Sequence, residues 1–340
     1  MGSLKIGLVR VLVAVCATIS VFVAPPADGQ YLVKSLPGHI PAALKGIPAS
    51  GRLAANTNLS LAVGLPLRNE AALDQLLAQL YDPRSTNFHR FIAPAEFAAR
   101  FGPGEGDYQA LQGFFRSRGL MVEGTHPNRL ILDIRGGVAN IERAFNLTLR
   151  TYSPAGSAKI VFAPDSEPSV PAELAVSDVW GLTDFGRPRP MSHPMNSTAV
   201  RIGHFNGSGS GGTYQGSDFR HAYAPGSRLT GAGQIVAVAE FDGYYPADIA
   251  AYEAQSGYAA IPLENVIVDS VSGIPGYSGD STAVAEVSLD IELAIAMAPG
   301  ISKLMVYEGS SPYDLFNRIV TDNQAKQVIG RRAMTCSTES

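Results

Sequence analysis

The stretch QIVAVAEF at residues 234–241 decides the fold of the second half of this chain. Its unbroken apolar run is typical of a parallel strand that is buried on both faces. A helix is predicted next, over 246–255, and then a strand over 265–270. Further predicted elements are a helix over 283–297, the strand KLMVYE at 303–308, a helix over 312–326 and the start of a strand at QVI, 327–329. This alternation predicts an α/β domain with a parallel sheet over 218–340.

The first half of the chain mixes the two kinds of element differently. Residues 30–182 alternate between short strands and amphipathic helices, and MVEGT and RLILDIRG around Pro127 predict one hairpin. This pattern predicts a small α+β sandwich. The predicted elements are a strand over 58–66, a helix over 69–80 with Asn69 as its N-cap, a helix from Pro94 to Phe101, a helix from Tyr108 to Arg118, a helix over 138–146 and a strand over 147–152.

Residues 1–29 have the pattern of a secretory signal peptide. Lys5 and Arg10 precede the apolar run from Val11 to Ala24, which is too short to span a bilayer. Small residues then offer a cleavage site before Gln30. The alternative is a buried N-terminal helix, which this position and these flanks disfavour. We therefore expect a secreted, extracellular protein that is not anchored in a membrane.

Residues 183–217 contain Pro and then Gly and Ser without periodicity, which predicts an exposed linker with a processing site. The alternative, a phosphate-binding loop at GSGSGG, lacks the flanking strand, the helix and the Lys of such loops.

Composition excludes several classes of protein. Hydrophobic residues make up 46% of the chain and charged residues 16%, which excludes an intrinsically disordered protein. The formal net charge of -4 argues against a nucleic-acid partner. The chain has two cysteines, and cleavage of the signal peptide would remove Cys16. Cys336 would then be alone, so no internal disulfide is expected.

Histidine is missing where a hydrolase would need it. All six histidines come before residue 231, at positions 39, 89, 126, 193, 204 and 221. The sequence therefore argues against a Ser-His-Asp triad built within the α/β domain and against a histidine metal cluster there. Gly231 and Gly233 precede the first parallel strand, whereas the glycines of a dinucleotide site follow it. The sequence indicates no cofactor-binding residue and no metal ligand.

The helix in STAVAEVSLDIELAIAMAPG, residues 281–300, is apolar almost all round, yet it carries Glu286, Asp290 and Glu292. Glu286 and Asp290 are four residues apart, so both carboxylates lie on one face. When two carboxylates lie close together and away from water, the pKa of at least one of them rises. A carboxyl group with a raised pKa can act as a general acid or base. The alternative is a solvent-facing helix edge, which spacing alone favours because such acidic pairs are common.

The segment AEVSLDIELAIAMAPG resembles the catalytic helix of the sedolisin family, the serine-carboxyl peptidases. DPRSTNFHRFIAPAEFAARFGP at 82–103 and VANIERAFNLTLRTY at 138–152 resemble the activation pro-domain of that family, and GSDFRHAY at 216–223 resembles the start of its mature enzyme. The resemblance implies a ferredoxin-like pro-domain followed by a subtilisin-like sheet, which contact each other within one chain. It also implies a secreted acid endopeptidase that acts on proteins or peptides.

The resemblance assigns roles to two residues. Glu286 matches the general base that activates a serine nucleophile, and Asp290 matches the partner that orients and polarises it. The Gly-Thr-Ser motif of the family nucleophile does not occur in this sequence, and neither the oxyanion Asp nor the calcium site of the full-length family enzyme is matched. Ser281, in SGDSTAVA, is a poor substitute that is better explained as a helix N-cap, because this helix is predicted to start at Asp280 or Ser281. We expect this chain to be inactive by itself.

The C-terminal stretch GRRAMTCSTES, 330–340, has no periodicity and suggests a premature stop or a frameshift, which would leave the peptidase domain truncated. A second class of function remains open, in which the pro-domain is a secreted inhibitor or folding chaperone of an intact relative. Four sequons, at Asn58, Asn146, Asn196 and Asn206, would be glycosylated only in a eukaryotic secretory pathway.

Overall fold

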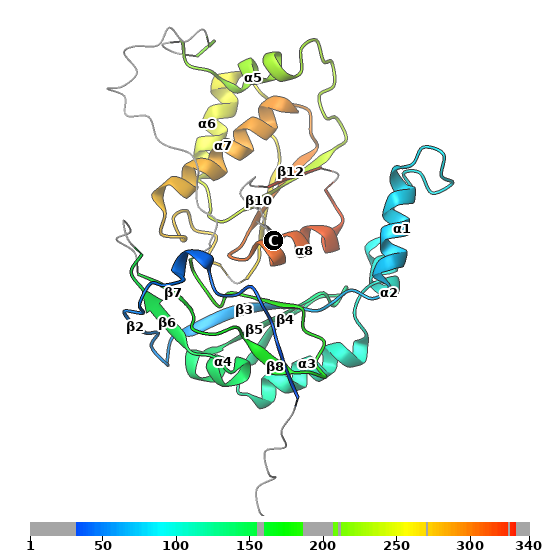
Figure 1. Ribbon diagram of the computed structural model, residues 1–340. Coiled ribbons are helices and arrows are strands. Elements are labelled where there is room, and N and C mark those ends of the chain that lie inside the picture. The colour runs from blue at the N-terminus through cyan, green and yellow to red at the C-terminus, as the bar shows by residue number, and fades with distance from the viewer. Residues whose placement is uncertain are drawn as a thin grey trace, which may run out of the picture.

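A computed structural model describes residues 32–154, 160–185, 207–209, 212–269, 271–325 and 327–330. They form two parts, which we call the antiparallel part, within 32–185, and the parallel part, within 212–330 (Figure 1). Several predictions fall outside the described residues: the signal peptide, most of the linker and its processing site, Asn196, Asn206 and Cys336. None of the helices in the described ranges is long and apolar enough to cross a membrane.

The antiparallel part is built on a four-stranded sheet with the order β4-β5-β3-β9. Every neighbouring pair in it is antiparallel, including the predicted hairpin. Helices α3 and α4 cover one face (Figure 1), where Phe115, Phe145 and Ile134 share one buried core. The strands are β3 (Asn58–Gly64), β4 (Met121–Thr125), β5 (Ile131–Gly137) and β9 (Asp178–Trp180), and the helices are α3 (Glu105–Ser117) and α4 (Val138–Phe145).

Shorter elements surround this sheet. Helices α1 (Glu70–Tyr81) and α2 (Pro94–Arg100) extend to one side of it (Figure 1). The sequence predicts β6 (Leu149–Tyr152), but it does not predict the other short strands, because two to four residues show too little alternation. The unpredicted elements are β1 (Val33–Ser35), β2 (Gly51–Arg52), β7 (Val161–Pro164), β8 (Ser169–Pro171) and a 3-10 helix η1 (Ala42–Leu44).

The parallel part has one sheet with the order β11-β12-β10-β13, and all its pairs are parallel. Alternate strand residues build two cores. On one face, Val236 and Val238 pack with Val287 and Ile291 of α7, and on the other Ala237 packs with α8 residues. The strands are β10 (Ile235–Glu240), β11 (Leu263–Ile267), β12 (Lys303–Glu308) and β13 (Gln327–Gly330), and the helices are α5 (Gly216–Tyr223), α6 (Pro246–Ser256), α7 (Ser281–Met297) and α8 (Pro312–Asp322).

Several local details differ from the predictions, including the start of α3, which is Glu105 and not Tyr108. Asn69 precedes α1 but its side chain does not cap it; its backbone is left-handed, with φ 54°, and Nδ2 donates to the Arg100 carbonyl. Of the two starts predicted for α7, Asp280 is confirmed as the N-cap and Ser281 is the first helical residue. Strand β11 begins two residues before the predicted strand, at Leu263. Helix α8 ends at Asp322, because Asn323 turns left-handed with φ 49°.

Helix α8 forms the junction between the two parts, lying over the sheet that contains β3 and β5 (Figure 1). Asn128 Nδ2 donates to Asn317 Oδ1 across it at 2.5 Å. The rings of Trp180 and Tyr313 meet edge to face, with centroids 5.3 Å apart. The intramolecular contact that the sequence analysis expects is therefore present.

Candidate active site

Helix α7 holds the two predicted catalytic carboxylates at the border of a buried surface. Asp280 starts the helix by accepting a hydrogen bond from the Thr282 N–H at 3.0 Å. Val287 and Ile291 are fully buried against the sheet. Glu286 and Asp290 each precede one of them, so both lie along the same edge of this stripe and are half-buried. The structure thus places these two carboxylates one turn apart and partly withdrawn from water.

Ser281, the weak candidate nucleophile, is the first residue of α7. Its side chain is not among those described.

The carboxyl end of the parallel sheet carries further acids, which the sequence analysis did not select. Glu240 ends β10 and Glu308 ends β12, and the two residues are direct partners in the ladder. Both are buried, with 1% and 0% of their surface exposed. Burial, together with the charge of Asp242, raises the pKa of Glu308 to about 7. The signal was visible in the sequence, because both VAVAE and LMVYE end an apolar strand with an acid.

Asp242 links this end of the sheet to the start of α7. It is fully buried, and it accepts hydrogen bonds from the N–H groups of Gly243 and Gly276, both at 2.7 Å. The Ser278 hydroxyl also donates to it. The loop held in this way leads directly into Asp280 and α7. Asp242 therefore fixes where the helix with Glu286 begins.

Tyr277 lies in the same loop and reaches across the sheet edge. Its hydroxyl donates to the Gly309 carbonyl at 3.3 Å. Burial raises the pKa of Tyr277, and the nearby charges of Glu308 and Asp242 raise it further. The tyrosine therefore stays neutral beside these acids. In open parallel sheets the carboxyl edge is where ligands bind, so this acidic edge next to α7 is the natural place for a catalytic site.

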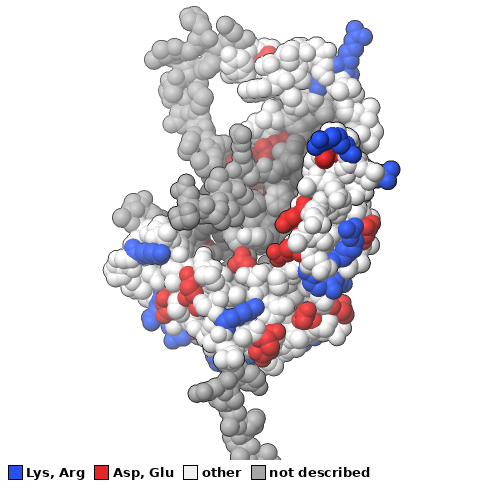
Figure 2. Space-filling model, turned by 45° about the vertical axis from the view of Figure 1, so that its right-hand side comes forward, with Lys and Arg blue, Asp and Glu red and all other residues white. Residues whose placement is uncertain are grey.

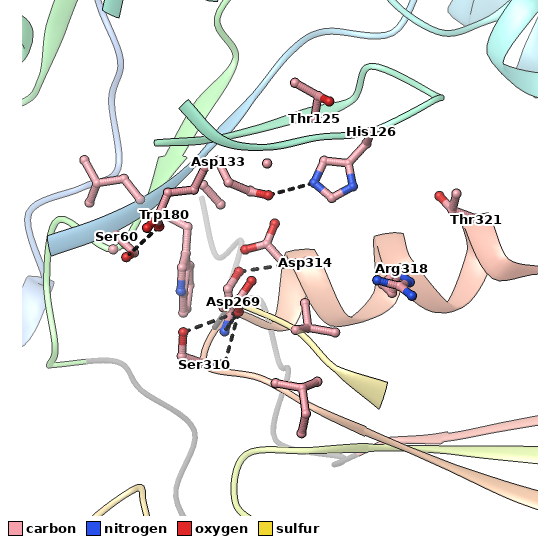
Figure 3. Close-up of a pocket in the computed structure, with 18 of the residues that line it drawn as sticks. Ser60, Thr125, His126, Asp133, Trp180, Asp269, Ser310, Asp314, Arg318 and Thr321 are labelled. Carbon is pink, nitrogen blue, oxygen red and sulfur yellow. Dashed lines mark hydrogen bonds and ion pairs between the residues drawn. The ribbon is translucent and has the colours of Figure 1, made fainter. Parts of the chain in front are cut away.

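A second acidic group lies in a cavity of about 440 Å³ at the junction of the two parts (Figure 3). His126 and Asp133 come from the antiparallel part, and His126 Nε2 lies 2.9 Å from Asp133 Oδ2. Asp269 and Asp314 come from the parallel part. One ligand atom each from His126, Asp133 and Asp314 lie within 4.8 Å of one another. Among the described residues, this group could hold a metal ion.

Asp314 is the most buried member of this group, with 3% of its surface exposed. Burial, together with the charges of Asp269 and Asp133, raises the pKa of Asp314 to about 9. Burial also raises the pKa of Asp269, although its carboxylate accepts hydrogen bonds from the N–H groups of Ser310 and Ser311. The sequence analysis missed this group because its members are far apart in the chain.

The surface around the junction is acidic as well. Figure 2 shows acidic side chains along the hollow between the two parts, while Lys and Arg are scattered among acids over the rest of this face. This arrangement agrees with the chain's net charge of -4.

Comparison with known proteins connects these features to one family. Residues 45–185 match the family described as "Pro-kumamolisin, activation domain". Sedolisin from Pseudomonas sp. (strain 101) is 27% identical over 288 residues, which cover 81% of this chain and 48% of that protein. Xanthomonalisin from Xanthomonas sp. (strain T-22) is 26% identical, covering 81% and 35%. Kumamolisin from Bacillus sp. (strain MN-32) is 30% identical, covering 66% and 41%.

The chain thus spans between about a third and a half of the length of these curated relatives. The matched activation domain covers most of the antiparallel part, and the aligned lengths of 288 and 296 residues extend well beyond it. An activation domain followed by peptidase sequence is the order of a proenzyme. The chain is therefore similar to sedolisin-family peptidases over 81% of its length, with the order of elements of a sedolisin-family proenzyme.

Proposed function

We propose that this chain is the activation domain and the first part of the peptidase domain of a secreted serine-type acid endopeptidase. The observation that carries the proposal is the pair of half-buried carboxylates, Glu286 and Asp290, one turn apart on α7. They lie next to the acidic carboxyl edge of a parallel sheet, where active sites of such sheets are built. Protein or peptide chains would be the substrates.

In this proposal, Glu286 accepts the proton of a serine hydroxyl as the hydroxyl attacks the peptide carbonyl. Asp290 orients Glu286 and polarises it, as the third member of a triad orients the base. A carboxyl base works best near its own pKa, so the reaction belongs in acid. The loop held by Asp242 fixes the start of the helix that carries both groups.

The nucleophilic serine and the oxyanion aspartate of the family have no match in residues 1–340, so we propose no peptide-bond cleavage by this chain alone. We assign none of its residues to the calcium site of the full-length family enzyme. We also propose that the antiparallel part is a ferredoxin-like sandwich and the parallel part the beginning of a subtilisin-like sheet.

A helix graft tests the catalytic pair. Residues Ser281–Met297 would replace the matching helix of kumamolisin, and hydrolysis of a peptide substrate would be measured at acidic pH. We expect the graft to keep peptidase activity. Glu286→Gln in the graft should then lower kcat by about 10³-fold or more, because the amide cannot accept the serine proton.

Glu292→Gln is the matched control, since Glu292 is on the same helix and is also half-buried. Its kcat should stay within about threefold of the unmodified graft. An active graft in which Glu286→Gln and Glu292→Gln behave alike would refute the assigned role of Glu286.

The second candidate function is favoured by the contact of the antiparallel part with α8 through Asn128 and Trp180. There the antiparallel part would act in trans as an inhibitor or folding chaperone of an intact relative. Residues 30–182 would be added to active kumamolisin, and the rate of peptide hydrolysis would be followed. Absence of inhibition at micromolar concentration, together with no gain in refolding yield, would exclude this function.

A further inference from the structure

The cavity at the junction brings together one histidine and two aspartates, which come from both parts of the chain. From their geometry we propose that His126, Asp133 and Asp314 bind one divalent first-row transition-metal ion, with Zn²⁺ as the probe. His126 and Asp133 belong to the antiparallel part and Asp314 to α8 of the parallel part. The ion would bridge the two parts. The proposal does not depend on the proposed peptidase activity.

The ligand atoms are close enough for a metal site to form once the side chains move together. The three ligand atoms lie within 4.8 Å of one another, and His126 Nε2 is already 2.9 Å from Asp133 Oδ2. Zinc binds His nitrogen and carboxylate oxygen at about 2.0–2.2 Å in tetrahedral geometry, so two ligands of one ion are about 3.3–3.5 Å apart. An ion at the centre would draw the most distant pair together by up to about 1.4 Å, which a side-chain rotation can supply.

Two carboxylates in the cavity each have one buried oxygen without a hydrogen-bond donor among the described residues. Asp314 is 3% exposed, and its Oδ1 has no hydrogen-bond partner in the described part of the chain. Asp133 Oδ1 is also buried without a partner there. In Figure 3 the two carboxylates point toward each other from opposite sides of the cavity. Two acceptors that face each other in a buried space need a cation or a proton between them.

The nearest basic side chain does not meet this need. Arg318 lies one turn after Asp314 on α8 and lines the same cavity. Its Nε donates to both oxygens of Asp322, at 2.9 Å each. Arg318 is therefore already neutralised by its own helix, and the space between Asp133 and Asp314 is left to another cation.

Neighbouring groups hold the ligands in place. Ser311 caps α8 by accepting a hydrogen bond from the Asp314 N–H at 3.3 Å, which fixes the first turn that carries Asp314. Asp269 accepts from the N–H groups of Ser310 and Ser311 at 3.1 and 2.9 Å, so it orients the same turn from outside the ligand set. Such supporting contacts are typical of metal sites.

The donor set selects the class of metal. One imidazole and two carboxylates suit zinc and its first-row neighbours, whereas calcium and magnesium prefer sites made of oxygen alone. Because the ligands come from both parts, tight binding requires the two parts to be docked. The ion would therefore stabilise the docked arrangement.

The test uses the full 340-residue chain after treatment with a chelator. Zn²⁺ would be titrated by calorimetry at neutral pH, with Mg²⁺ and Ca²⁺ in parallel. We expect saturable Zn²⁺ binding at this site that Asp314→Asn and His126→Gln each weaken by at least about 100-fold. His89→Gln is the control, because His89 is exposed and distant in sequence from the cavity ligands. It should leave Zn²⁺ affinity unchanged.

Hydrogen exchange would report the bridge itself. Zn²⁺ should slow exchange both in the β4–β5 hairpin and in α8 of the unmodified chain, and in neither segment of the Asp314→Asn variant. Should Asp314→Asn fail to fold, His126→Gln still decides, since His126 follows a hairpin strand and its loss removes one ligand from the other side. Equal Zn²⁺ affinity in the unmodified chain and the folded variants would overturn the proposal. Binding of Mg²⁺ or Ca²⁺ as tight as that of Zn²⁺ would overturn the assigned metal class.

Discussion

The two parts of this chain treat buried charge in opposite ways. In the antiparallel part, hydrogen bonds and ionic partners lower the pKa of the exposed Asp165 and of the half-buried Asp178, against the opposing effect of partial desolvation. In the parallel part, burial raises the pKa of Glu292, Glu308 and Asp314. Asp218, in the first turn of α5, is the exception there, because backbone hydrogen bonds from Gln215 and Ser208 lower its pKa.

The partners explain the difference. His39 donates from Nε2 to Asp178 at 2.9 Å, and Arg52 pairs with the buried Glu142. Glu308 in the parallel part has neither carboxylate oxygen hydrogen-bonded within the described residues. The buried Glu142 is thus paired with a cation, whereas the buried Glu308 has no such partner and its charged form is disfavoured. The part proposed to do chemistry in acid is the part with buried acids that favour the protonated form.

The largest expected effect comes from Glu308→Gln. The folded-state pKa of Glu308 is raised from 4.5 to about 7. The stability that its neutral form provides is therefore complete below pH 4.5 and lost as the pH rises through 7. The amide keeps the shape and removes the charge, so at pH 8 the variant should be more stable than the unmodified chain by about 3 kcal/mol. Urea unfolding at pH 4 and pH 8 measures this.

At pH 4 the two proteins should have nearly equal stability, because Glu308 is then protonated in both the folded and unfolded states. If the variant is no more stable than the unmodified chain at pH 8, the charge of the buried Glu308 does not destabilise the fold, which contradicts the account.

Asp242→Asn should have an intermediate effect of about 2 kcal/mol in the destabilising direction. Unlike Glu308, the buried Asp242 accepts hydrogen bonds from backbone N–H groups, those of Gly243 and Gly276. An amide can accept at one atom only, so its NH₂ group would face donors. Faster hydrogen exchange in residues 271–282 would report the loosened loop.

The matched control is Asp248→Asn, the same change at an exposed position on α6. It should alter the free energy of unfolding by less than about 0.5 kcal/mol. If both substitutions changed the free energy of unfolding equally, Asp242 would not hold the loop in place.

His39→Gln should have the smallest effect, about 1 kcal/mol. Burial alone would lower the pKa of His39, but the hydrogen bond and charge of Asp178 outweigh it and raise this pKa above 6.5. The hydrogen bond from His39 lowers the pKa of Asp178 below 3.8. The pair therefore stabilises the fold between these values and is lost above the raised pKa of His39.

The variant should be less stable than the unmodified chain at pH 5.5 and closer to it at pH 8.5. His89→Gln, at an exposed position, is the control. The same loss at both pH values would show that His39 acts by packing and not by charge.

The regular elements could be predicted from the sequence because each carries its own periodic signal. KLMVYE gives β12 with the predicted bounds, and VANIERAFN gives α4 to within one residue. The helix that carries Glu286 and Asp290 was predicted for the same reason. Strands of two or three residues, such as β2 and β9, form because a partner strand is present, and no local sequence pattern predicts them.

The acidic group at the junction could not be predicted from the sequence for a related reason. His126 and Asp314 meet only because α8 lies over the β4–β5 hairpin, and tertiary contacts of this kind leave no spacing to detect. Glu240 and Glu308 could have been found, since both end predicted parallel strands whose ends share one edge. The rule that ligands bind at the carboxyl edge of a parallel sheet was applied only to Gly231 and Gly233, and it covers these two acids as well.

The most direct test of a peptidase part adapted to acid is hydrogen exchange of the whole chain at pH 5 and pH 8, in the presence of a chelator. Rates would be divided by the intrinsic chemical rate at each pH, which isolates the stability of each amide. We predict that protection in β10 and β12 falls from pH 5 to pH 8, while protection in β3 and β5 changes little. Equal loss in both sheets, or greater protection of β10 and β12 at pH 8, would contradict the opposite treatment of buried charge in the two parts.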